Sequence, residues 1–417
     1  MKARGVVRVP GDKSISHRAL ILGALATGRS RISGILHSAD VSSTASVLRS
    51  LGVAVPDLAS TFTLPGKGLR GLRAPGSPLY AGNSGTTVRL MSGVLAAHAF
   101  ESRLEGDTSL SRRPMKRIAE PLTAMGARFE FAREDGLPMT IHGGRLMGIT
   151  WNTRSASAQT KSAILLAGLV GGVQVSVIES QKSRDHTERM LTSLGAPVET
   201  EETMVSLSPV DSISPLDLDV PGDPSSAAYF VAYAILGGGE TTIPGVCINP
   251  TRTGFIDTLA EMGARIVCEE RIAAAGDSVA TIVARKSSLV DWVLDRARIP
   301  SMIDELPLLA CVAAAARVTL EVRGAHELRV KESDRIAVVA RNLRAVGVDV
   351  EELNDGFIVK RRTKPLAGRI ETDGDHRIAM SFGVLAALQG SSIEIDDPGC
   401  VSVSYPRFWE DLKSLHR

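Results

Sequence analysis

Cations and hydroxyls at the start of a predicted helix are the first residues in this sequence that could do chemistry. The stretch 9–20, VPGDKSISHRAL, follows an apolar strand, and its Pro-Gly pair breaks that strand. Asp12 or Ser14 can cap the helix, whose first turn then offers free backbone N–H groups and a partial positive charge. Lys13 and Arg18 add two cations at the same place. The pattern indicates a site for a negatively charged group, with an ordinary capped helix and solvated charges as the alternative.

Comparable residues gather at other predicted helix starts. Because the net charge of the chain is only +2, cations concentrated there point to a small polyanion, which guanidinium groups bind in a bidentate way. The acids among them are candidates for proton transfer. Arg89 and Lys161 stand about one turn inside their helices, so a structural ion pair is the alternative for each. The set comprises Asn83, Gly85, Thr86, Arg89, Arg112, Arg113, Ser157, Gln159, Lys161, Arg184, Asp304, Glu305, Lys331, Glu332, Arg335, Asp375, His376 and Arg377.

Internal repeats predict the elements that position these residues. The segment 220–230, VPGDPSSAAYF, repeats the first motif half a chain later. Five helices are each expected to end at a glycine in the left-handed conformation, followed by a strand. These glycines are Gly52, Gly126, Gly195, Gly263 and Gly347. An earlier helix in each copy is expected to begin near Asp12, Asn83, Ser157, Asp223, Asp304 and Asp375.

The repeats sum to six copies of strand, helix, strand, helix, strand, strand. The last copy stops before its final strands, and the strand at 5–9 is expected to supply what is missing there. Two apolar runs, 163–178 and 306–316, are too short to span a membrane and predict buried helices and strands.

Composition narrows the class of protein. A chain of 417 residues predicts more than one domain, and a repeat offset of half the chain favours two. The hydrophobic share of 44% and charged share of 23% are typical of a globular protein. The small net charge and 4% aromatic residues argue against nucleic acid as a partner. Four scattered cysteines and the absence of an apolar leader favour a cytoplasmic protein, and no spacing indicates a metal site or a Ser-His-Asp triad.

Eight motifs, in order and covering the whole chain, resemble the 5-enolpyruvylshikimate-3-phosphate synthase family of the shikimate pathway. They are PGDKSISHRAL, GNSGTTVRL, GDTSLSRRPM, SAQTKSA, SRDHTE, IDELPLLA, RVKESDRIA and DGDHRIAMSF. The resemblance implies an α/β fold with two similar domains, each an inside-out α/β barrel of three βαβαββ units. One domain would be 12–221 and the other 1–11 plus 222–417, with the active site in the cleft between them.

The resemblance also implies the reaction. The enolpyruvyl group of phosphoenolpyruvate would pass to the 5-hydroxyl of shikimate 3-phosphate by addition and elimination, releasing phosphate without a metal or other cofactor. This step belongs to chorismate and aromatic amino acid biosynthesis and is the target of glyphosate. A monomer is expected, with no nucleic-acid or membrane partner.

Residue roles carry over motif by motif. Asp304 resembles the group that accepts the hydroxyl proton, and Glu332 resembles the group that protonates the methylene carbon, with Lys331 beside it. Asp304 and Lys331 are also implied to bind substrate. Lys13 is implied to contact both substrates and to take part in catalysis. The residues implied to bind shikimate 3-phosphate are Lys13, Ser14, Arg18, Ser157, Gln159 and Arg184. Those implied to bind phosphoenolpyruvate are Gly85, Arg113, Arg335 and Arg377.

Two positions depart from the family pattern. Ala158 stands where some members have a second serine, which suggests that Arg184 or Lys161 compensates for the lost phosphate donor. Val403 stands where some members have a lysine for phosphoenolpyruvate, so that contact is in doubt here.

Two other functions are alternatives to this one. The sister enzyme that transfers enolpyruvyl to a UDP-N-acetylamino sugar carries a reactive cysteine in a glycine-rich loop, and the matching loop GDTSLSRRPM has none. A non-catalytic anion-binding repeat protein would not need Asp304 and Glu332 beside arginines.

Overall fold

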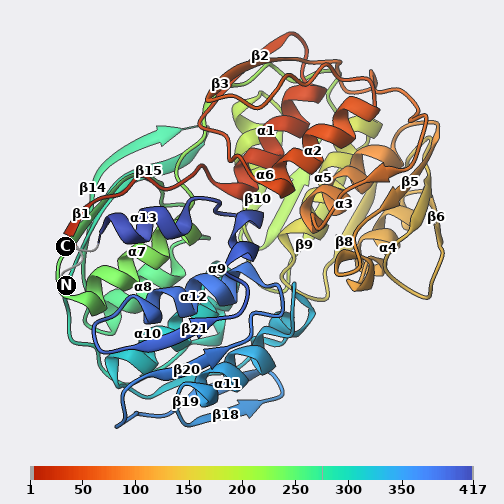
Figure 1. The fold of residues 1–417 in the computed structure, drawn as a ribbon. Coiled ribbons are helices and arrows are strands. Elements are labelled where there is room, and N and C mark those ends of the chain that lie inside the picture. Colours follow the sequence, from red (N-terminus) through yellow and green to blue (C-terminus); the bar gives the residue numbers. More distant parts are fainter. Residues whose placement is uncertain (1–3, 275, 416–417) are drawn as a thin grey trace. The chain divides into compact units, whose positions relative to one another are not determined.

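Two compact units divide the chain. The computed structural model describes residues 4–274 and 276–415, so parts of the predicted domains at 1–3, 275 and 416–417 lie outside the described residues. Unit 1 comprises Met1–Pro10, Pro221–Ile272 and Ser278–Arg417, and unit 2 comprises Gly11–Val220 and Ala273–Asp277. The α/β class predicted from the sequence is confirmed, since helices alternate with short strands throughout both units (Figure 1).

Unit 2 contains six α-helices and a short 3-10 helix among its described residues. The helices are α1 Lys13–Leu25, α2 Ala39–Ser50, α3 Gly85–Ala96, α4 Lys116–Ala124, α5 Ala158–Gly171, α6 His186–Ser193 and the 3-10 helix Leu110–Arg112. The strands are β2 Arg29–Ser33, β3 Thr61–Pro65, β4 Leu79–Tyr80, β5 Glu101–Glu105, β6 Arg128–Phe131, β7 Met139–His142, β8 Ile149–Asn152, β9 Val175–Ile178, β10 Val198–Glu201, β11 Met204–Leu207 and β12 Asp217–Asp219.

Unit 1 repeats the same alternation. Its helices are α7 Pro224–Gly237, α8 Gly254–Glu261, α9 Ile299–Met302, α10 Leu306–Ala316, α11 Arg335–Ala345, α12 His376–Ala386, α13 Phe408–Ser414 and the 3-10 helices Arg296–Arg298, His326–Val330 and Pro398–Val403. Its strands are β1 Arg4–Val6, β13 Glu240–Cys247, β14 Arg265–Ala274, β15 Asp277–Arg285, β16 Trp292–Val293, β17 Leu320–Val322, β18 Val350–Leu353, β19 Gly356–Val359, β20 Ala367–Ile370 and β21 Ser392–Ile395.

The six small sheets in the described part of the chain share one order of pairing. In the four-stranded sheet β4-β5-β7-β6, the first pair is parallel and the other two pairs are antiparallel. The sheets β8-β9-β11-β10 and β16-β17-β19-β18 repeat this order. Shorter versions are β12-β2-β3 and β20-β21, in which the first pair is again parallel. The repeat predicted from the sequence therefore has a direct counterpart in strand pairing.

The N-terminal strand does not complete the last copy, so that prediction is wrong. β1 pairs in parallel with β13, with Arg4 opposite Glu240. It thereby takes the first position of the sheet β1-β13-β15-β14, while β21 pairs with β20. This position of β1 fits the order of pairing, because every other four-stranded sheet also begins with a strand parallel to its second strand.

Apolar helices form the interior of each unit. In unit 2, α3 packs against α5 and α1, and in unit 1, α7, α10 and α12 pack against one another (Figure 1). Ile15–Leu25 of α1 and Leu306–Ala314 of α10 are buried without interruption. Helices that are apolar on all sides need other elements around them, which the sheets and the more polar helices supply. These central helices begin within two residues of the predicted starts.

The five predicted helix-ending glycines all adopt positive φ, from 84° at Gly195 to 115° at Gly126. No single helix in the described part of the chain is long and apolar enough to cross a membrane. The bent pair Arg296–Met302 and Leu306–Ala316 passes a test of length and composition alone.

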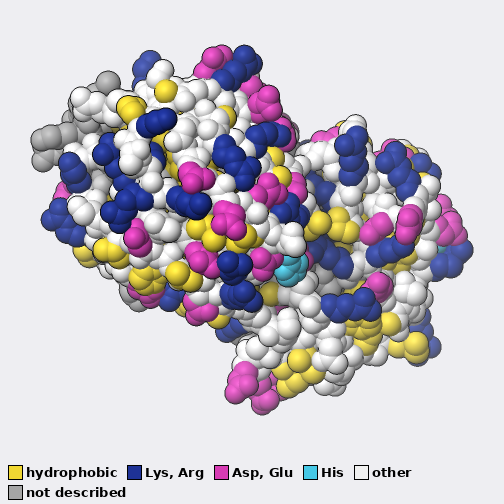
Figure 2. All heavy atoms as spheres, turned by 90° about the horizontal axis from the view of Figure 1, so that it is seen from below, with side chains coloured by type: hydrophobic (Ala, Val, Ile, Leu, Met, Phe, Trp, Pro, Cys, Tyr) yellow, Lys and Arg dark blue, Asp and Glu magenta, His cyan; other side chains and the backbone are white. Residues whose placement is uncertain are grey.

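Surface charge is mixed. On the face shown in Figure 2, Lys and Arg side chains are interspersed with Asp and Glu side chains. This agrees with a net charge of +2 and with the absence of a broad basic field on that face.

Candidate active site

The start of α1 forms as the sequence predicts. Asp12 is the N-cap, and its carboxylate accepts a hydrogen bond from Ile15 N at 2.8 Å. The ammonium group of Lys13 forms an ion pair with Asp40 of α2. A cap of this kind leaves the first-turn N–H groups and Lys13 at one end of a buried helix.

Arg18 lies one turn further along and is 4% exposed. Its Nε donates to Thr187 Oγ1 at 2.7 Å, Nη2 donates to Ser162 Oγ at 2.8 Å, and Nη1 donates to Ser14 O at 3.0 Å. Burial lowers the pKa of Arg18 to about 10, and this outweighs the opposing effect of Glu188. The guanidinium is therefore still charged near neutral pH while bonded to neutral acceptors.

The start of α3 brings a glycine and two guanidinium groups together. A Cβ placed on Gly85 would lie 3.1 Å from Arg89 Nη1 and 3.4 Å from Arg113 Nη1. Arg113 also donates to Asn83 Oδ1. Gly85 has an ordinary backbone conformation, since its φ is not positive. Its special property in this structure is thus the lack of a side chain next to two cations.

Gln159 connects α5 to the same group. Its Oε1 accepts from Arg89 Nη1 at 2.7 Å, and its Nε2 donates to Thr86 Oγ1 at 3.1 Å. Ser157 caps α5, with its hydroxyl accepting from Thr160 N at 3.3 Å. Gly85, Arg113 and Gln159, predicted from separate motifs, are therefore neighbours in unit 2.

Lys161 is a structural ion-pair residue, which was one of the two alternatives for it. It is 1% exposed, and its Nζ lies 2.7 Å from both Glu179 Oε2 and Glu188 Oε1. Burial by itself lowers the pKa of Lys161, but the two carboxylates outweigh it and the net shift is upward. Nothing in this arrangement supports the expectation that Lys161 replaces the phosphate donor lost at Ala158.

Arg184 stays a candidate for that compensation. It is half-buried in the loop before α6. Its charge adds to the lowering of the Arg18 pKa, which places the two cations near each other.

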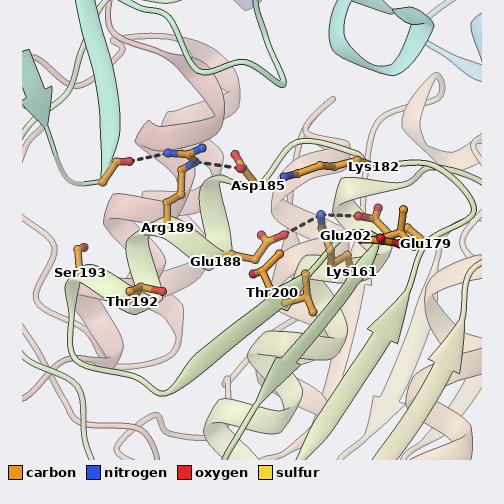
Figure 3. A pocket seen from close by; sticks show the side chains of 13 residues that line it. Lys161, Glu179, Lys182, Asp185, Glu188, Arg189, Thr192, Ser193, Thr200 and Glu202 are labelled. Atoms are coloured by element: carbon orange, nitrogen blue, oxygen red, sulfur yellow. Dashed lines mark hydrogen bonds and ion pairs between the residues drawn. The ribbon is translucent and has the colours of Figure 1, made fainter. Parts of the chain in front are cut away.

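A cavity of about 400 Å³ is lined by residues of α5, α6 and the β10–β11 hairpin (Figure 3). Its charged lining includes Lys161, Lys182 and Arg189 as well as Glu179, Asp185 and Glu188. Figure 3 shows Lys161 between Glu179 and Glu188, with Arg189 directed to Asp185. Lys161, a candidate cation of the sequence, lines this cavity, but among the described residues none of those implied to bind shikimate 3-phosphate or phosphoenolpyruvate does. The cavity therefore does not coincide with the predicted substrate site.

Unit 1 holds the predicted acids around one guanidinium. Arg335 is 1% exposed and donates to Asp375 through Nε at 2.8 Å and through Nη2 at 3.2 Å. It also donates to Glu332 Oε2 at 2.7 Å and to Asp304 Oδ1 at 3.2 Å. Lys331 Nζ lies 3.4 Å from the same Asp304 oxygen. The structure thus gathers both predicted proton-transfer acids on two predicted substrate-binding cations.

The charges of this cluster support one another. Burial opposes the charged form of Arg335, yet Asp375, Glu332 and Asp304 together raise its pKa. Burial likewise opposes ionisation of Asp375, but Arg335 holds its pKa below the usual value. The side chains of Asp304 and Glu332 keep 15% and 23% exposure, so a ligand can reach them.

Arg377 is the second residue of the neighbouring helix α12. It is buried, and its pKa is raised by Tyr229, Asp304 and Glu305 against the effect of burial. Burial raises the pKa of Tyr229 to about 12, in spite of its hydrogen bond with Arg377. Arg377 therefore belongs to the same charged region of unit 1 as Asp304.

Several residues of these networks were missed by sequence reasoning. Arg252 donates to Ser225 Oγ at 2.9 Å and to Asp223 Oδ1 at 3.2 Å, and the hydroxyl of Ser225 donates to Glu305. The repeat VPGDPSS could have signalled Ser225, which occupies the position of Ser14 in the first copy. Thr187 stands in the motif SRDHTE, but nothing in the sequence shows that it faces Arg18.

The fold is α/β, and the site gathers cations and carboxylates of the kind that bind and act on small anions. Residues 1–412 match the sequence profile of EPSP synthase (3-phosphoshikimate 1-carboxyvinyltransferase). A 3-phosphoshikimate 1-carboxyvinyltransferase of Sulfurihydrogenibium sp. is 45% identical over 423 residues, covering 100% of this chain and 98% of the relative. One from Syntrophomonas wolfei is 46% identical over 417 residues, covering 99% and 97%.

A solved EPSP synthase structure from Acinetobacter baumannii agrees with these relatives. It matches with a TM-score of 0.86 and 41% sequence identity, covering 99% of this chain and 95% of that one. The chain belongs to the EPSP synthase family. The predicted family and the predicted transferase class are confirmed, and enolpyruvyl transfer in aromatic amino acid biosynthesis is the activity of this family.

Proposed function

We propose that the chain transfers the enolpyruvyl group of phosphoenolpyruvate to the 5-hydroxyl of shikimate 3-phosphate, with the predicted residues in the predicted roles. The observation that carries the assignment is the cluster in which Asp304 and Glu332 bond to the buried guanidinium of Arg335. Two acids held by one cation can serve an addition and an elimination, because one proton must be moved off the hydroxyl and another onto carbon.

The addition step uses both acids. Asp304 accepts the 5-hydroxyl proton while the oxygen attacks the substituted carbon of phosphoenolpyruvate, and Glu332 gives a proton to its methylene carbon. In the elimination, the Glu332 carboxylate takes a proton back from the resulting methyl group and the bond from carbon to the phosphate oxygen breaks. Phosphate leaves with the proton that Asp304 accepted. Arg335, Lys331 and Arg377 offer the positive charge that stabilises the carboxylate and the departing phosphate.

The cations of unit 2 bind the substrates in this proposal. Arg18 with Lys13, Ser14, Ser157, Gln159 and Arg184 would hold shikimate 3-phosphate. Gly85 and Arg113 would line the phosphoenolpyruvate subsite. Fixed guanidinium groups orient an anion before the reaction, and such positioning is a large part of catalysis in transfer reactions.

The finer architecture also belongs to the proposal. Three units of each half would form an inside-out α/β barrel, with domain limits at 12–221 and at 1–11 plus 222–417. The order of pairing shared by the six sheets supports this description. A monomeric state, a cytoplasmic location and an active site between the domains stay predictions.

Phosphate release tests the function. The purified chain with phosphoenolpyruvate should release phosphate when shikimate 3-phosphate is added and not when a UDP-N-acetylamino sugar is added. Release with the UDP-sugar alone would favour the sister activity. No release with either acceptor would favour the anion-binding repeat protein.

A further inference from the structure

Arg18 differs from Arg335 of unit 1 in the kind of partner that it has. Every hydrogen bond given to its side chain among the described residues goes to a hydroxyl or a backbone carbonyl. These bonds use three of the five N–H groups of the guanidinium, which leaves one N–H on Nη1 and one on Nη2. Asp12, Glu188 and Asp277 act on this cation without a hydrogen bond to it. Two N–H groups and a positive charge therefore stay available to an anion.

Two hydroxyls fix one edge of this guanidinium. Thr187 Oγ1 and Ser162 Oγ accept from Nε and Nη2, and the two hydroxyl oxygens lie 2.7 Å from each other. The three side chains thus form a closed set of hydrogen bonds joining α1, α5 and α6. Because a guanidinium is planar, two acceptors on one edge determine the direction in which the opposite edge points.

The next residue on each helix strengthens this contact. Lys161 precedes Ser162 on α5, and Glu188 follows Thr187 on α6, with Nζ and Oε1 of this pair 2.7 Å apart. Glu179 also pairs with Lys161 at 2.7 Å. Both ion pairs are almost fully buried, so the two helices are joined at adjacent points in a region with little solvent screening.

We propose that Thr187 and Ser162 are positioning residues that aim Arg18 at an anionic group of shikimate 3-phosphate. The inference rests on the proposed function, in which Arg18 binds that substrate. A carboxylate in the place of either hydroxyl would neutralise the guanidinium and compete with the substrate anion. Hydroxyls set its direction and leave its charge available to the ligand.

Isosteric and conservative variants of Thr187 test the proposal. Thr187→Val removes the acceptor with little change of shape, and Thr187→Ser keeps it. We expect Thr187→Val to weaken the binding of shikimate 3-phosphate, measured by calorimetry without phosphoenolpyruvate, about tenfold, because a hydrogen bond to a charged group is lost. Thr187→Ser should stay within about twofold of the wild type, since the hydroxyl is retained.

Kinetics and a double variant separate positioning from a general loss of structure. Thr187→Val should raise the KM for shikimate 3-phosphate while kcat and the KM for phosphoenolpyruvate change less than about threefold. In an Arg18→Lys background, Thr187→Val should add less than about a twofold loss, because the group that it positions is gone. Ser162→Ala provides a second removal of an acceptor if Thr187→Val fails to fold.

A matched control exists in the same unit. Ser206→Ala breaks the hydroxyl pair with Ser176 at 2.8 Å, on β11 and β9, and should leave substrate affinity unchanged. Wild-type affinity in both Thr187→Val and Ser162→Ala would overturn the inference, as would an equal loss in the Arg18→Lys background. Failure of the wild type to bind shikimate 3-phosphate would instead refute the proposed function, and the inference with it.

Discussion

Arg18 in unit 2 and Arg335 in unit 1 are both almost fully buried, yet their surroundings are opposite. Arg18 bonds to two hydroxyls and a carbonyl. Arg335 bonds to the carboxylates of Asp375, Glu332 and Asp304. The difference suggests a division of tasks. A cation bonded to neutral groups can attract an anionic ligand, whereas one bonded to carboxylates also organises the acids that must carry protons.

The paired helix starts α1 and α7 show how the difference arises from a shared motif. Both have an aspartate N-cap, Asp12 in one and Asp223 in the other. When the two sequence copies are aligned, Pro224 takes the position of Lys13 and Tyr229 takes the position of Arg18. The second copy therefore lacks cations of its own in these positions, and Arg377 from α12 bonds to Tyr229 instead.

The largest expected effect concerns the acids around Arg335. Asp304→Asn and Glu332→Gln should each lower kcat by about 10²–10⁴-fold, because each removes a group that transfers a proton. Affinity for shikimate 3-phosphate should stay within about tenfold. Turnover and calorimetric binding measured on the same preparations check this. Glu371→Gln is the control, as this carboxylate is exposed and pairs with Arg341 at 3.7 Å. Near-normal turnover in either acid variant would contradict its role.

Removing each guanidinium in turn tests whether the different partners of Arg18 and Arg335 matter for stability. Arg335→Met leaves buried Asp375 without its cation and should cost about 3–5 kcal/mol of unfolding free energy. Arg18→Met leaves Thr187 and Ser162, which can still bond to each other, and should cost about 1–3 kcal/mol. Urea titrations followed by hydrogen exchange in α11 and α1 measure each unit separately. Equal losses in the two variants would show that the partners of these arginines matter less than their burial.

Acid should weaken the Arg335 cluster selectively. The pKa of Asp375 is lowered in the folded protein, so its stabilising contribution is present above the pKa of an unfolded aspartate, about 3.9, and is lost as the pH falls through the lower folded value. The difference in unfolding free energy between wild type and Asp375→Asn should therefore shrink below about pH 4. Urea titrations from pH 7 to pH 3 test this, and a constant difference would refute it.

Local signals in the sequence predicted the parts of the fold that depend on neighbours in the chain. Gly126 and Gly195 adopt positive φ as expected, and the cap at Asp12 forms. The strand at the N-terminus was assigned to the wrong sheet, because parallel pairing with β13 depends on residues more than two hundred positions away. Hydrophobic patterning shows that a strand exists but not which edge it joins.

The candidate site shows the same limit. Cations at helix starts could be recognised from spacing, and the family motifs supplied their roles. The partners of those cations could not be predicted, since Thr187 meets Arg18 and Glu188 meets Lys161 only when α6 packs beside α5 and α1. Whether an arginine faces a hydroxyl or a carboxylate is a property of packing that the spacing of residues in the sequence does not show.

The smallest expected effect concerns Gly85, and it tests whether the cations of unit 2 can adjust. A methyl group there would lie 3.1 Å from Arg89 Nη1, which is closer than usual contact and requires a shift of a few tenths of an ångström. Because the φ of Gly85 is not positive, Gly85→Ala should change the unfolding free energy by less than about 1 kcal/mol.

The added methyl should narrow the phosphoenolpyruvate subsite. Family resemblance implies that glyphosate, the longer molecule, competes for that subsite, so the wild type should be sensitive to glyphosate. The inhibition constant of glyphosate should then rise about tenfold or more in Gly85→Ala, and the KM for phosphoenolpyruvate less than about threefold, because the longer ligand loses more contact to the same obstruction. Measuring the inhibition constant and the KM side by side tests this prediction. A parallel rise of the two constants would mean that the methyl group displaces the guanidinium groups of Arg89 and Arg113. Their hydroxyl and amide partners would then hold them too loosely to discriminate between the two ligands.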